Sequence, residues 1–275
     1  MNKKHEEYKN KEWLTMQLDK CGTISEIARQ TGYNRKTIAR YIKEFDIKTN
    51  RYDTSHRKYH FDDRFFEKID SEEKAYWLGF LTADGCLYHH KTSYDIQFNL
   101  NEKDIDHLMN FAQSIKSDKQ PKLVKQGKHN CAFFRISSKR MFDNLHTLGI
   151  TVKKTGKEII PNIPYDLIRH FIRGYFDGDG CISKHKTKRN ETYYTMTIVC
   201  SNENFLYDIS TYIEENTGLH FNVYPVQNNA FILNSVAKKK NYHFYKFLYK
   251  DATIYLKRKF EIVQEFFNNY SPICE

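Results

Sequence analysis

Two segments of the chain share one pattern, which constrains the fold more than any other feature of the sequence. Residues 76–86 read YWLGFLTADGC and residues 171–181 read FIRGYFDGDGC. Both segments are apolar with a helical period, and each places small residues four positions apart, as in the pair Gly174 and Gly178. Residues at that spacing share one face of a helix and let two backbones approach closely. The repeat, which includes the equivalent pair Gly79 and Ala83, therefore predicts two helices packed through their small faces.

An aspartate closes each predicted helix. Asp84 and Asp179 are each followed by a glycine, Gly85 and Gly180, and we expect these glycines to end the helices in the left-handed conformation. The C-terminus of a helix already carries partial negative charge. Two carboxylates that meet there need a cation between them, and hard oxygen ligands favour Mg²⁺. The sequence therefore predicts a magnesium site formed by these two carboxylates.

The same order of elements follows each motif. The first copy predicts a hairpin (residues 86–90 and 94–101), a helix (103–116), two strands (122–126 and 132–137) and a helix (139–148). The second predicts a hairpin returning at 193–200, a helix (203–216), strands at 221–224 and 230–233, and a helix at 242–249. Two copies of αββαββα predict an α+β fold with two antiparallel sheets. Each sheet would have an apolar face under helices and a polar face open to a ligand.

Strand alternation indicates which side chains face that ligand. Adjacent residues of a strand point to opposite faces, so Ile96 and Phe98 belong to the core while Gln97 and Asn99 face outward. Amide side chains can pair with the edge of adenine in the major groove. In the second copy Met196 and Ile198 should be buried, and the outward set is Tyr193, Thr195 and Thr197.

The first 60 residues predict a separate basic module. They hold 14 Lys and Arg against 8 Asp and Glu, a net charge of +6 within a chain whose net charge is +10. We expect helices at 12–18, 24–31 and 35–45, with Gly32 in the turn and Asn34 as the cap of the third. The first helix should turn Trp13 and Met16 inward, with Leu14 as a further candidate. This arrangement resembles the helix-turn-helix of transcription regulators and resolvase-like proteins, whose last helix enters the major groove.

The third helix would then present the DNA-contacting side chains Arg35, Lys36 and Arg40. A three-helix module that docks another protein is the alternative. An excess of cations, with 44 Lys and Arg against 34 Asp and Glu, favours a partner with a phosphate backbone, although it could serve solubility alone. No CxxC or Cys/His cluster has zinc-finger spacing, so we expect neither a structural zinc nor a disulfide framework.

WLGFLTADG and IRGYFDGDG resemble the two motifs of single-chain LAGLIDADG homing endonucleases, and the likeness in element order covers about residues 61–270. The resemblance implies two pseudo-symmetric halves whose sheets form a DNA-binding saddle, and the predicted helix-turn-helix domain precedes them. It also implies cleavage of both strands of double-stranded DNA, with Asp84 and Asp179 as the metal ligands. Thr82 stands where the family often has Asp, and Asp177, its equivalent, is expected to be a cap or interface residue.

The family also uses a basic residue near the end of each half and a polar residue after the second hairpin strand. The resemblance assigns the basic role to Lys259 and to Lys154, with Lys153 as the rival of Lys154. It assigns the polar role to Glu102 and Asn202.

Three other functions fit the same motifs. An RNA maturase that assists intron splicing stays open, which would make intron RNA a second partner. A non-cleaving transcription regulator is disfavoured because both aspartates are present. An intein-embedded endonuclease is disfavoured because no splicing motifs flank the repeat and the chain starts at Met1.

The expected organisation is a helix-turn-helix domain (1–47), a basic linker (48–60), a first half (61–160) and a second half (161–275). With no signal peptide and no apolar run of membrane-spanning length, we expect a cytoplasmic monomer with no membrane partner.

Overall fold

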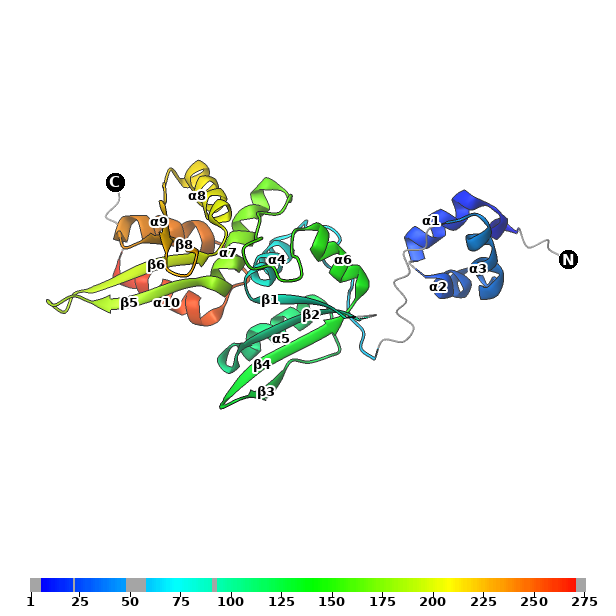
Figure 1. Cartoon of the computed structure of the whole chain (residues 1–275), viewed down its shortest axis with the longest axis horizontal. Helices are drawn as coiled ribbons and strands as arrows, with labels where there is room; N and C mark the ends of the chain where they lie inside the picture. The colour runs from blue at the N-terminus through cyan, green and yellow to red at the C-terminus, as the bar shows by residue number, and fades with distance from the viewer. Residues whose placement is uncertain (1–5, 22, 48–57, 91–92, 271–275) are drawn as a thin grey trace. The chain divides into compact units, whose positions relative to one another are not determined.

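The chain divides into two compact units, residues 1–58 and 59–275 (Figure 1). The computed structural model describes residues 6–21, 23–47, 58–90 and 93–270. The basic linker predicted at residues 48–60 lies, up to residue 57, outside the described residues.

The first unit holds three short helices. They are α1 (Lys11–Cys21), α2 (Ile24–Thr31) and α3 (Arg35–Glu44), preceded by a 3₁₀ turn η1 (Glu7–Lys9). Thr23 caps α2 by accepting a hydrogen bond from the Glu26 amide, and Asn34 caps α3 through the Lys36 amide. Gly32 ends α2 with a φ of 71°, a left-handed conformation that a residue without Cβ adopts at little cost. The predicted second and third helices and their turn are thus confirmed.

The first helix differs from the prediction in the residue that it buries. Leu14 is fully buried against Ile27, Ile38 and Ile42, whereas Met16 is 55% exposed. Residues two apart on a helix do not share a face, so a helix that buries Leu14 turns Met16 to the solvent. The expectation that Met16 lies inward is wrong.

The second unit contains the repeated order of elements. The first copy runs α4 (Glu72–Asp84), β1 (Gly85–His90), β2 (Ser93–Asn101), η2 (Glu102–Asp104), α5 (Ile105–Ser114), β3 (Lys122–Gln126), β4 (His129–Ser137) and α6 (Lys139–Thr147). The second runs η3 (Tyr165–Leu167), α7 (Ile168–Asp179), β5 (Gly180–Lys186), β6 (Thr192–Cys200), α8 (Glu203–Thr217), β7 (Val223–Val226), β8 (Ala230–Ser235), α9 (Lys238–Tyr249) and α10 (Lys257–Asn269).

The strands form two four-stranded antiparallel sheets of the same topology, β1-β2-β4-β3 and β5-β6-β8-β7. Helices α4 and α7 lie side by side in the middle of this unit, with one sheet on either side (Figure 1). The register is also repeated, because Gly85 pairs with Phe98 in the first sheet and Gly180 with Ile198 in the second. The predicted α+β fold with two related halves is confirmed.

Strand alternation decides which face of each sheet the helices cover. Ile96, Phe98, Met196 and Ile198 are each at most 1% exposed and belong to the one core that spans both halves. Their neighbours along β2 and β6 stay accessible to solvent. Each sheet therefore keeps one open face, as the sequence predicted.

One helix was not predicted, and several elements begin or end at other residues than predicted. Helix α10 was not expected, although Val263 and Phe266 follow its helical period and are buried. Helix α9 begins at Lys238, ahead of the predicted residue 242. Strand β7 begins at Val223, because Phe221 is instead held by hydrogen bonds to Ser210. None of the helices in the described part of the chain has the length and apolar character needed to cross a membrane.

Candidate active site

The site begins with the crossing of α4 and α7. A Cβ added to Gly79 would lie 1.9 Å from the Phe171 carbonyl oxygen, and one added to Gly174 would lie 2.0 Å from the Tyr76 oxygen. Real side chains do not approach so closely, so only glycine allows this backbone contact. A Cβ on Gly178 would likewise meet the Ala83 Cβ at 2.3 Å. The small residues that the sequence singled out thus form the crossing.

Because the helices cross so tightly, their last residues come together. Asp84 ends α4 and Asp179 ends α7, and a Cβ on Gly178 would lie 3.3 Å from the Asp84 Oδ2 atom. Burial and then the charge of Asp179 raise the pKa of Asp84 to about 6. Asp179 is more exposed, yet loss of hydration raises its pKa as well. The two carboxylates therefore lie close enough for the charge of Asp179 to raise the pKa of Asp84, as the sequence predicted for the two helix ends.

The two following glycines have a different role from the one expected. Gly85 has a φ of −77° and Gly180 a φ of −73°, both extended rather than left-handed. A Cβ at either position would press on the preceding turn, 2.6 Å from the Leu81 oxygen and 2.5 Å from the Phe176 oxygen. The left-handed helix ends predicted at these glycines are therefore wrong. Glycine is needed because each chain passes directly from a helix into a strand, too close to its own last turn for a side chain.

A lysine covers the end of each helix. Lys154 Nζ donates to the carbonyl oxygens of Leu81 (2.9 Å), Thr82 (2.6 Å) and Ala83 at the end of α4. These oxygens lie in the last turn, where the helix dipole is negative, and the Leu81 oxygen also accepts a hydrogen bond from the Gly85 amide. Lys153, the rival of Lys154, is exposed and has a φ of 58°. The geometry thus places Lys154, and not its neighbour, at this helix end.

Lys259 repeats the arrangement in the second half. Its Nζ donates to the oxygens of Phe176 (2.8 Å), Gly178 (3.1 Å) and Gly180, and its side chain is 4% exposed. Burial lowers the pKa of Lys259 to about 8 and also lowers the pKa of Lys154. Both lysines lower the pKa of the two aspartates in return. Each half thus places one carboxylate, Asp84 or Asp179, and one ammonium group, Lys154 or Lys259, at the ends of the crossing helices.

The predicted polar residues after the second hairpin strands occupy equivalent positions with different surroundings. Glu102 is exposed in η2. Asn202 caps α8 through the Asn204 amide (3.1 Å) and donates to the Glu158 carbonyl oxygen (2.8 Å). The structure therefore ties Asn202 into the scaffold and leaves Glu102 open to solvent.

Sequence reasoning missed Glu158. This residue is 8% exposed and interacts electrostatically with both Lys154 and Asp179, and its Oε1 accepts a hydrogen bond from the Gly156 amide (3.2 Å). Its Oε2 atom is buried and has no hydrogen-bond partner among the described residues. No local pattern marked it, because it lies in a segment without regular structure between the two halves.

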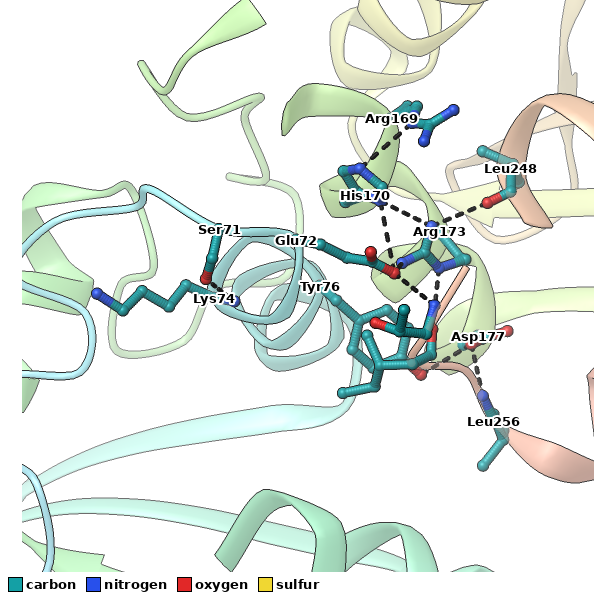
Figure 2. Close-up of polar contacts among 12 residues, drawn as sticks. Ser71, Glu72, Lys74, Tyr76, Arg169, His170, Arg173, Asp177, Leu248 and Leu256 are labelled. Carbon is teal, nitrogen blue, oxygen red and sulfur yellow. Dashed lines mark hydrogen bonds and ion pairs between the residues drawn. The ribbon is translucent and has the colours of Figure 1, made fainter. Parts of the chain in front are cut away.

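A buried polar network joins the two crossing helices (Figure 2). The Asp177 carboxylate is fully buried and accepts hydrogen bonds from the Tyr76 hydroxyl (2.7 Å), the Tyr249 hydroxyl (2.5 Å) and the Leu256 amide (2.7 Å). Asp177 is therefore an interface residue, as expected, and it joins α4, α7, α9 and the start of α10.

Arg173 belongs to the same network. Its side chain is fully buried, with Nη2 2.6 Å from Glu72 Oε1, while Nε and Nη1 donate to the Ile254 and Leu248 oxygens (Figure 2). Leaving such a charge unpaired in a protein interior is costly. The network thus fixes how the two halves meet.

The predicted DNA-contacting side chains lie on the open faces of the sheets. Asn99 Nδ2 donates to Gln126 Oε1 (2.8 Å), and Thr195 contacts His185 Nε2 (3.2 Å). The register makes Thr197 the counterpart of Gln97, and Val199, which the prediction omitted, the counterpart of Asn99. Gln97, Tyr193, Thr195 and Thr197 are all partly exposed.

The remaining predicted contacts lie in the first unit. Arg35, Lys36 and Arg40 are exposed along α3, and the Arg40 guanidinium lies 4.9 Å from the centre of the Tyr41 ring.

Comparisons with known proteins match both halves to one kind of domain. Residues 73–140 match the WhiA LAGLIDADG-like domain, and residues 166–247 match the LAGLIDADG-like domain. These matches support the LAGLIDADG family for both copies of the repeat.

Two solved structures show the same fold. Meganuclease I-SmaMI bound to uncleavable DNA aligns with a TM-score of 0.51 at 11% identity, over 72% of this chain and 90% of that one. The LAGLIDADG homing endonuclease I-GzeII in complex with its DNA target aligns with a TM-score of 0.50 at 12% identity, over 73% and 89%. At such identities the likeness shows the fold alone.

Two curated proteins of Methanocaldococcus jannaschii are similar in sequence. A replication factor C small subunit is 33% identical over 124 residues, and an uncharacterised protein is 25% identical over 164 residues. The matches cover 44% and 58% of this chain. They span only 7% and 60% of the length of those relatives.

Proposed function

We propose that this chain, with a LAGLIDADG-like domain in each half, is a site-specific endonuclease that hydrolyses phosphodiester bonds of double-stranded DNA. The observation that carries the proposal is the pairing of Asp84 with Asp179 at the crossing, each beside a lysine of its own half. One carboxylate and one lysine per half provide for one cleavage event on each strand. The DNA bound to I-SmaMI and I-GzeII supports the same class of ligand for this fold.

A divalent metal fits this pair of carboxylates. Their mutual repulsion, which contributes to the raised pKa of Asp84, would be relieved by a cation between them. No group of three or more His, Cys, Asp and Glu that could hold a metal occurs among the described residues, so the protein would supply two carboxylates. Mg²⁺ is often held in this way, by one or two carboxylates together with substrate phosphates. When bound, Mg²⁺ would supply Lewis acidity that activates water and stabilises the leaving oxygen.

The two lysines act in this proposal as fixed positive charges. Lys154 and Lys259 donate to carbonyl oxygens of the helix ends, so they neutralise the negative poles of α4 and α7. They also favour the ionised form of both aspartates and would attract the phosphate that is to be cleaved. Glu102, exposed after β2, would organise water around the phosphate, whereas Asn202, at the equivalent position after β6, would position this end of the site through the Asn204 amide and the Glu158 carbonyl oxygen.

A DNA-binding regulator without cleavage is the second candidate. The three-helix first unit, with its exposed cations on α3, favours it because such a module can bind DNA alone. A regulator has no need for two carboxylates at one crossing, so Mg²⁺-dependent cleavage separates the two functions.

The test is cleavage of DNA that spans the insertion site of the chain's own gene, with Mg²⁺. Asp84→Asn and Asp179→Asn should each abolish double-strand cleavage while binding survives or tightens, because removal of negative charge does not repel phosphate. Asp208→Asn, on an exposed position of α8, is the matched control and should cleave normally. If both active-site variants linearise the target at the parental rate, the assignment is wrong.

A further inference from the structure

The outer hairpins of the two sheets occupy equivalent places but differ in charge. The first outer hairpin, residues 122–137, is β3 and β4, and the second outer hairpin, residues 223–235, is β7 and β8. The first has the sequence KLVKQGKHNCAFFRIS, with four Lys and Arg and no Asp or Glu. The second has the sequence VYPVQNNAFILNS and contains no charged residue.

The strand registers let the two open faces be compared position by position. Arg135 pairs with Gln97 on the first sheet, and Asn234 pairs with Thr197 at the same place on the second. One strand further out, Lys122 pairs with Phe133, and its counterpart Tyr224 pairs with Ile232. Two cations of the first face are thus replaced by uncharged side chains of the second. The Asp95 carboxylate, 3.9 Å from Arg135, is likewise replaced by the uncharged Thr195.

The first open face ends in a hollow suited to an anion. The hollow has a volume of about 240 Å³ and is lined by Tyr59, Lys119, Gln120, Lys122, Phe133 and Arg135. Lys122 and Arg135 are both exposed. Cations around a hollow of this size match a phosphate group of the DNA backbone.

The second open face exposes apolar side chains to the solvent. Val199 is 42%, Tyr224 49% and Val226 40% exposed, and Ile232 lies between them in the register. Val199 follows Thr197 on the open side of β6, and Ile232, Tyr224 and Val226 lie on β8 and β7 of the same face, which is proposed to read DNA. Exposed apolar patches mark interaction sites. In the major groove the apolar group that distinguishes one base is the C5-methyl group of thymine.

We propose that the outer hairpins of the two sheets contact their half-sites by different chemistry, the first through backbone phosphates and the second, together with Val199, through thymine methyl groups. This inference rests on the proposed function, because it takes DNA as the ligand of both open faces. It makes the target asymmetric, with contacted thymines in the half-site under β5-β6-β8-β7.

The experiment starts from sequences that the full chain selects out of a random-sequence DNA pool. In the selected target each thymine is replaced by deoxyuridine, which removes only the methyl group and keeps base pairing. Replacement in the second half-site should weaken binding about fourfold for each contacted thymine, the factor that corresponds to one buried methyl group. Replacement in the first half-site should leave the affinity unchanged.

Two matched variants separate the two chemistries. Val226→Asn with Ile232→Asn removes two of the four apolar side chains, so it should reduce the effect of deoxyuridine and leave the salt dependence unchanged. Lys122→Gln with Arg135→Gln should keep the effect and flatten the slope of log affinity against log salt by about one unit per lost phosphate contact. All four positions are on the open faces, and thermal melting verifies folding.

Three results would overturn the inference. Deoxyuridine could have the same effect in both half-sites, or none in the second. The apolar patch could also bind a second copy of the chain, shown by a dimer without DNA that Val226→Asn with Ile232→Asn dissociates. If the unmodified chain selected no sequence at all, the proposed function would fall together with this inference.

Discussion

At the scale of single residues, folding places the active-site carboxylates where their ionised forms are less stable than in water. The folded protein raises the pKa of Asp84 from 3.8 to about 6 through burial and the charge of Asp179. A raised carboxyl pKa means that the ionised form is destabilised by folding. The metal-free protein therefore gives up stability at neutral pH to keep two carboxylates at the crossing.

Asp84→Asn should consequently stabilise the metal-free protein at pH 7.5, by roughly 1–3 kcal/mol. The gain should shrink as the pH falls from 7 towards 4, because Asp84 of the parental protein takes up its proton near pH 6 when folded. Urea denaturation with a chelator measures the difference, and added Mg²⁺ should reduce it by stabilising the parental protein. An unchanged or lowered stability at pH 7.5 would contradict the electrostatic strain.

At the scale of secondary-structure elements, the crossing of α4 and α7 depends on backbone contact. Gly79→Ala should lower the free energy of unfolding by at least about 3 kcal/mol, because two backbones must separate to admit one methyl group. Gly127→Ala is the control: its φ of 61° disfavours alanine, but nothing lies within 4 Å, so the cost should be about 1 kcal/mol. Equal losses in chemical denaturation would show that the helices can move apart.

The strand β2 offers a second comparison of neighbouring positions. Phe98→Ala should cost roughly 3–5 kcal/mol through its cavity, since Phe98 is fully buried. Gln97→Ala and Asn99→Ala should change stability little and instead relax preference at a few base pairs, each amide contact contributing about 1–3 kcal/mol of discrimination. Cleavage of single-base target variants, run beside thermal melts, checks both. The open-face assignment fails if Gln97→Ala unfolds the protein while Phe98→Ala alters only base preference.

At the scale of the whole molecule, the two units have separate cores. Leu14, Ile27, Ile38 and Ile42 form one cluster, and the core of residues 59–275 forms another. Deletion of residues 1–50 should thus leave a folded, Mg²⁺-dependent nuclease with weaker affinity and a shorter footprint. Loss of Arg35, Lys36 and Arg40 should flatten the salt slope by about one unit for each phosphate contact removed. A footprint and slope that stay the same would assign the first unit to a protein partner.

Much of this organisation could be predicted from periodicity. Small residues four apart required a close helix crossing, and alternation along residues 94–100 required one buried and one open sheet face. Such patterns are local, since each follows from residues within a turn of helix or a few strand positions. For that reason the sequence by itself determined the two halves, the paired aspartates and the faces of β2 and β6.

Other features depend on contacts between residues far apart in the chain. Only the tertiary structure decided that Lys154 rather than Lys153 reaches α4, more than 70 positions away, and that Glu158 lies by the active site. It also showed that Gly85 and Gly180 are needed because the backbone passes close to the preceding helical turn, and not because it adopts a left-handed conformation. A local pattern carries no record of which distant carbonyl a side chain will meet, because that depends on how the helices pack.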